Sequence, residues 1–144
     1  MPRFVKLAAV LAVAVLAIAP VTGCKQAPSL LANIGGMEGL SKFNDAFAAN
    51  LLADPAVSKY IDQAGADMVK RGVTTSVAKA SNVPIPSDGV DLTSFLHEKN
   101  LDEGAIAGFK NGANKAAKDV SLSPEATKGM TAMVDEVLKG LGKK

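Results

Sequence analysis

From Ser29 onward, apolar side chains recur at the three- and four-residue spacing of α-helices, and this spacing constrains the fold more than any other feature. In this stretch, no run alternates apolar and polar residues over the length of a β-strand. Residues 82–91 contain two prolines and a glycine and are therefore expected to form a loop. The sequence predicts one all-α domain over residues 29–144.

Capping residues and helix breakers divide this domain into the expected helices. Asp91, Asp102 and Ser123 are predicted to cap helices, and Pro55 suits the first turn of a short one. Gly140 is predicted to close the last helix. The helices expected on these grounds are 40–54, a short helix through 60–61, 66–80, 92–98, one from 102 to about 120, and 124–140.

The first 24 residues have the three parts of a bacterial export signal. Arg3 and Lys6 form the charged start, residues 7–18 are an unbroken apolar run, and Pro20 ends that run. The run is shorter than the roughly 18 apolar residues expected of a membrane-spanning helix. Residues 21–24, Val-Thr-Gly-Cys, resemble the lipobox of bacterial lipoproteins, in which the Cys is acylated and becomes the first residue.

The lipobox resemblance implies both boundaries and location. Residues 1–23 would be a cleaved signal peptide, and residues 24–28 would be the acylated Cys24 and a short tether to the helical domain. Cys24 would hold the protein on the lipid bilayer of the cell envelope. Lys25 stands where a retention Asp would be expected for the inner membrane, which favours the outer membrane, facing the periplasm. The alternative is an ordinary signal peptide followed by an unrelated free thiol.

Composition excludes several classes of function. The chain has 16 Lys and Arg against 14 Asp and Glu, and Arg3 and Lys6 account for the excess. From Cys24 onward the charges balance, so binding to nucleic acid through net positive charge is not expected. A single Cys excludes an internal disulfide framework, and a single His excludes a bis-histidine metal site. No nucleophile lies in a recognisable catalytic motif, so we expect no enzymatic activity.

A longer resemblance begins at residue 34. Gly35-Gly36 is followed by an apolar stripe that contains Phe47 and then by Leu-Ala-Asp-Pro at residues 52–55. Over residues 34–61 this order resembles, without gaps, the opening of group 1 truncated hemoglobins, in which a Gly-Gly pair separates a stub helix from the second helix. The match continues around the proximal helix of that family at Gly89, Leu92, Leu101 and Ile106.

The resemblance implies a truncated-globin-like helical domain that holds heme b between its helices and binds oxygen or another diatomic gas. A proximal imidazole must coordinate the iron, and His97 is the single candidate in this chain. His97 is therefore the implied metal ligand. The implied cofactor-binding residues are His97, Phe47, Tyr60, Arg71, Thr75 and Phe95.

The sequence also departs from the family pattern. The gapless pairing places Leu96 at the proximal position, and a one-residue offset turns a helical side chain by about 100°. The distal Tyr of the family is Ala48 here. His97 is thus either an axial ligand or a solvated surface side chain, and Phe47 is either core or cofactor wall. The alternative function is a heme-free, globin-like envelope lipoprotein that acts as a structural or interaction module.

Overall fold

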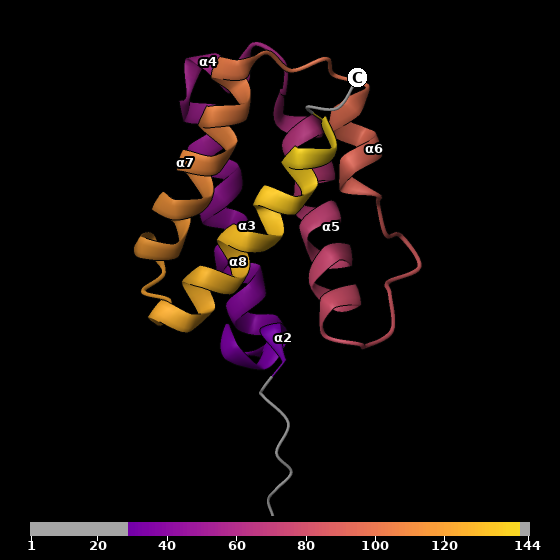
Figure 1. The fold of residues 1–144 in the computed structure, drawn as a ribbon, viewed down its shortest axis with the longest axis vertical. Helices are drawn as coiled ribbons and strands as arrows, with labels where there is room; N and C mark the ends of the chain where they lie inside the picture. The colour runs from indigo at the N-terminus through magenta and orange to yellow at the C-terminus, as the bar shows by residue number, and fades with distance from the viewer. Residues whose placement is uncertain (1–28, 142–144) are drawn as a thin grey trace, which may run out of the picture.

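The structure, a computed structural model, describes residues 29–141 (Figure 1). The predicted signal peptide, Cys24 and the tether lie outside the described residues. Residues 29–141 contain no β-strand, and the all-α prediction is confirmed. None of the described helices is both long and apolar enough to cross a membrane. The helices are α2 (Leu30–Asn33), α3 (Gly36–Ala53), α4 (Pro55–Ser58), α5 (Gln63–Ala80), α6 (Leu92–His97), α7 (Glu103–Asp119) and α8 (Pro124–Leu141).

The predicted capping residues begin their helices. The side chains of Asp91, Asp102 and Ser123 each accept a hydrogen bond from the backbone N–H three residues later, at 3.2, 2.8 and 3.1 Å. Pro55 occupies the first turn of α4, as expected, and Asp54 caps that helix. These side chains pair backbone donors that a helix start leaves without a partner.

Some helix boundaries differ from the sequence predictions. The second long helix, α5, begins at Gln63 because the carboxylate of Asp62 accepts a hydrogen bond from the Gly65 N–H at 2.9 Å. The last helix continues through Gly140, so the expectation that this glycine closes it is wrong. A glycine inside a helix weakens it without ending it, and packing of the rest of α8 outweighs that loss.

A sharp bend joins α2 to α3. Gly35 and Gly36 have φ angles of 92° and 75°, in the left-handed region that side chains disfavour. A Cβ added to Gly39 would overlap the carbonyl oxygen of Ile34. The glycines of this segment are therefore required by the backbone path, which places α2 against α3, α5 and α8.

The core lies where α3 packs against α5 and α7, while α8 crosses in front of α3 and packs on α7 and α6 (Figure 1). Three aromatic rings stand at its centre. The ring centroids of Phe43 and Phe47 are 5.5 Å apart, and those of Phe47 and Phe109 are 6.1 Å apart and nearly perpendicular. All three side chains are fully buried. Edge-to-face rings at these distances pack favourably, so the interior is closed by aromatic contacts.

Candidate functional site

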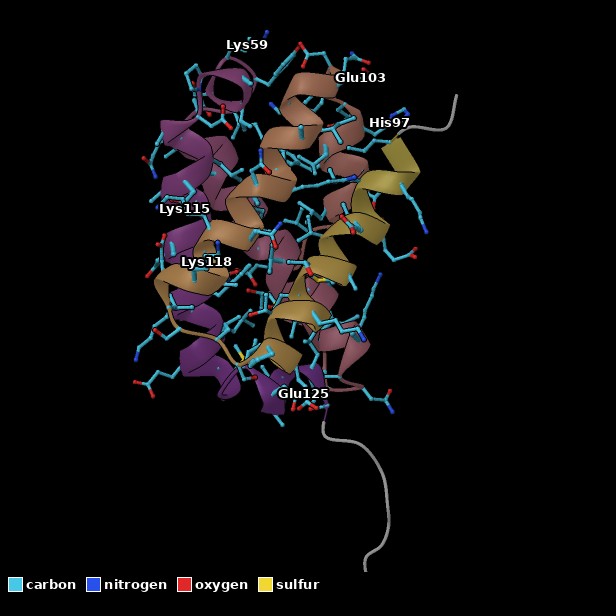
Figure 2. All side chains as sticks on the ribbon, turned by 60° about the vertical axis from the view of Figure 1, so that its left-hand side comes forward. Lys59, His97, Glu103, Lys115, Lys118 and Glu125 are labelled. Carbon is cyan, nitrogen blue, oxygen red and sulfur yellow. The ribbon has the colours of Figure 1, made fainter. Side chains whose placement is uncertain are left out.

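The short helix α6 faces the core with Leu96, whereas His97 is exposed. Leu92 and Leu96 are four residues apart and therefore share one face of the helix; Leu96 is only 1% exposed. The next residue points about 100° away. Figure 2 accordingly shows His97 at the periphery of the molecule. The placement matches the gapless pairing, in which Leu96 holds the proximal position.

Helices α5 and α6, which carry Arg71, Thr75, Phe95 and His97 among the implied cofactor contacts, are in direct contact. A Cβ added to Gly72 of α5 would lie 2.8 Å from both Cβ and Cδ1 of Leu92 and 3.1 Å from its Cα. Gly72 is itself buried. Such close approach is available to glycine alone. A porphyrin ring has no room between these helices at this point.

The apolar residues implied as cofactor contacts have other partners. Phe47 packs between Phe43 and Phe109 in the centre of the core. Phe95 is half-buried, and the Lys99 ammonium lies 5.1 Å from the centroid of its ring. A cation at this distance is attracted to the ring face. Phe47 is therefore a core residue in this structure, and Phe95 lies partly at the surface.

The polar residues implied as cofactor contacts, Arg71 and Thr75, are also engaged elsewhere. The Thr75 hydroxyl donates to the Arg71 carbonyl oxygen at 2.9 Å and accepts from the Val90 N–H at 3.1 Å. Its one proton is thus used within α5. The exposed Arg71 side chain lies 3.9 Å from the carboxylate of Asp88.

Tyr60 lies at the end of the bundle and joins α4 to α7. Its hydroxyl donates to the carboxylate of Asp102 at 2.9 Å, and the Lys59 ammonium lies 3.3 Å from the same carboxylate. Hydrogen bonds from the Ala105 N–H and the Tyr60 hydroxyl, together with the charge of Lys59, lower the pKa of Asp102 below its ordinary value. The hydroxyl of Tyr60 is thus engaged at the start of α7, while the half-buried side chain of Tyr60 packs against the edge of the core.

Taken together, the residues present do not fit a heme. The only imidazole of the chain faces outward, Leu96 is buried at the position that the resemblance assigns to the proximal ligand, and α5 touches α6 at Gly72 and Leu92. Leucine offers iron no lone pair. Within residues 29–141, no cluster of His, Cys, Asp and Glu is arranged to hold a metal ion either.

A polar groove between α3 and α5 was not predicted from the sequence. It has a volume of about 270 Å³, and Asn44, Asp45 and Lys70 contribute to its lining. Asn44 is 6% exposed; its Nδ2 donates to Thr74 Oγ1 at 3.0 Å, but its buried Oδ1 accepts no hydrogen bond. One feature of the sequence points to this groove: Asn44 lies four residues after Leu40 and therefore on the buried face of the helix.

A smaller, apolar hollow of about 50 Å³ adjoins this groove. It lies between α2, the start of α3, the end of α5 and the loop that follows α5. Leu31, Met37, Pro84 and Pro86 are among its lining residues, and the described residues that line it carry no charge. The prolines and glycine of residues 82–91 predict only a connecting loop, so the sequence does not indicate this apolar surface.

Comparison with known proteins adds no assignment. No protein-family model matches the chain, and no curated protein sequence matches it.

Proposed function

We propose that this chain is a heme-free, lipid-anchored helical module of the bacterial cell envelope. Its helices follow the order of a truncated hemoglobin, but it acts as a structural or interaction module and without cofactor chemistry. In this proposal the acylated Cys24 holds the domain on the outer membrane, facing the periplasm.

The contact between α5 and α6 carries the heme-free part of the proposal. Gly72 permits this contact with Leu92, and Leu96 is buried on the same face of α6, so the two helices pack directly on each other there. The outward position of His97 supports the same reading. A protein with the helix order of a globin, in which α5 packs directly on α6, would keep the globin shape without binding heme.

The lipid anchor is supported by the sequence. The single Cys of the chain stands at the one position that a lipobox requires, after an apolar run too short to span a membrane. Acylation contributes about 0.8 kcal/mol per buried CH₂, so two or more chains would hold the protein stably on a bilayer.

Hemin titration tests the absence of heme binding. The chain from Lys25 onward and its His97→Ala variant are titrated with hemin, and their visible spectra are compared. We expect the two proteins to give the same spectrum, without a sharp Soret band. A sharp band in the wild type that disappears in the variant would contradict the proposal.

Fractionation of cells tests the anchor. The full chain is expected in the membrane fraction, and its Cys24→Ser variant is expected in the soluble fraction. A Lys25→Ala variant serves as the matched control, because it alters the neighbouring residue and keeps the acylated thiol. Membrane association of the Cys24→Ser variant would overturn the anchor.

A further inference from the structure

We propose that the end of the bundle around the apolar hollow lies against the bilayer and that Met37 and Ile85 insert into its interfacial region. This surface, called here the membrane-facing end, consists of α2, the first turn of α3, the end of α5 and residues 82–86. The inference rests on the lipid anchor of the proposed function, and it names the partner of this surface as phospholipid.

The two large apolar side chains that are exposed in the described region lie at this end. Met37 is 59% exposed and Ile85 is 49% exposed, and they are the large apolar residues left most open to solvent within residues 29–141. Met37 lines the hollow together with Pro84 and Pro86, which flank Ile85 in the chain. Single exposed apolar residues are common. Met37 also borders the polar groove that contains Asp45 and Lys70. Its contact with the hollow and the neighbouring Ile85 form a surface suited to an apolar partner.

The tether places this same end next to the lipid. Ser29 begins the described region, and the four residues 25–28 separate it from Cys24. An extended chain advances about 3.5 Å per residue, so Ser29 stays within roughly 17 Å of the acylated Cys. The 18 residues of α3 extend over about 27 Å. The opposite end of the bundle is therefore the farther one from the bilayer.

A hydrogen bond fixes the tethered helix to the hollow. The Leu31 N–H of α2 donates to Ser81 Oγ at 2.9 Å, directly after the end of α5. The Leu31 side chain lines the hollow beside Met37. The point where the tether enters the fold and the exposed apolar residues consequently belong to one packed unit, at the lower end of the bundle in Figure 1.

Apolar contact, and not charge, is the expected source of this docking. From Cys24 onward the chain has 14 positive and 14 negative side chains. Attraction to anionic headgroups needs a basic cluster and weakens with salt. Insertion of Met37 and Ile85 should therefore occur on zwitterionic lipid and persist at high salt.

Fluorescence quenching on vesicles tests the inference with the full, acylated chain. Because acylation blocks the Cys24 thiol, a Cys introduced by Met37→Cys or Ile85→Cys is the only reactive one and takes an environment-sensitive fluorophore. Glu103→Cys provides the control: Figure 2 shows Glu103 and Glu125 at opposite ends of the bundle, and Glu125 lies on the side of α2. The proteins are reconstituted into phosphatidylcholine vesicles that contain a lipid with a nitroxide on its acyl chain.

We expect at least about twofold stronger quenching at positions 37 and 85 than at position 103, unchanged at high salt. Equal quenching at all three positions, in protein that floats with the vesicles, would overturn the inference and leave the anchor intact. Fluorescence changes that grow with protein density but lack nitroxide quenching would identify a second copy as the partner and also overturn it. Protein that does not float with the vesicles would refute the anchor and the inference together.

Discussion

Gly72→Ala is expected to destabilise the protein although alanine is the better helix former. In a helix interior, alanine is favoured over glycine by about 1 kcal/mol. Here the new Cβ would lie 2.8 Å from Leu92 Cβ and 3.1 Å from Leu92 Cα. Rotation of the Leu92 side chain moves neither atom, so α5 and α6 must separate. Overpacking of this kind costs typically about 1–3 kcal/mol, and we place Gly72→Ala in the upper part of that range.

The net expectation is a loss of about 1–2 kcal/mol in the free energy of unfolding. Urea denaturation followed by far-UV circular dichroism measures this change on the chain from Lys25 onward, provided that the m-value is unaltered. Gly104→Ala is the matched control. Its Cβ would meet no atom closer than 3.4 Å, and we expect unchanged or higher stability.

The sign of the effect decides the argument. If α5 and α6 were separated in solution, as a heme slot requires, Gly72→Ala would gain the helix-forming advantage without the clash. For Gly72→Ala, an increase of about 1 kcal/mol in the free energy of unfolding would therefore refute the direct packing of α5 on α6. An increase of that size is expected only where the added Cβ has room, as at Gly104.

Three further predictions follow from the burial and hydrogen bonding of single residues. Leu96→Ala should lower the free energy of unfolding by about 2–5 kcal/mol because it empties a core position. His97→Ala should change the free energy of unfolding by less than about 0.5 kcal/mol. Urea denaturation compares the two variants, and equal effects would contradict the orientation of α6. The lowered pKa of Asp102 implies a contribution to stability that is present above the ordinary pKa of about 3.9 and is lost as the pH falls through the lower folded value. The difference in thermal midpoint between wild type and Asp102→Asn should therefore shrink below about pH 4. A difference that stays constant with pH would refute this. Asn44→Leu should leave the free energy of unfolding within about 1 kcal/mol of wild type, because the unpaired Oδ1 is removed along with the hydrogen bond to Thr74. Urea denaturation measures this change. A loss above about 2 kcal/mol would mean that Oδ1 has a partner.

The helical domain was predictable because its signals are local. Apolar spacing identified the faces of the long helices, and Asp91, Asp102 and Ser123 begin helices as their side chains suggest. The apolar spacing predicts a start of α5 at residue 66, three residues after the observed one, because this spacing does not reveal the cap at Asp62. The prediction that Gly140 ends the last helix is wrong because glycine only weakens a helix that tertiary packing supports.

The candidate site was less accessible to sequence reasoning because it depends on how helices approach each other. A one-residue difference between Leu96 and His97 decides whether leucine or imidazole faces the core, and only the helix orientation fixes it. The sequence does not predict that Gly72 allows the close approach of α5 to α6, because the residue it touches, Leu92, lies 20 positions away. The unpaired acceptor of Asn44 likewise depends on which donors α5 presents to α3.

The bend between α2 and α3 determines how the chain enters the helical bundle. Gly35 and Gly36 adopt angles that other residues resist, and the missing side chain of Gly39 lets α3 rest on the Ile34 carbonyl. The bend fixes the direction of α2 relative to α3, so a pull on the chain before Ser29 would reach the bundle through α2 and its contacts with α3, α5 and α8.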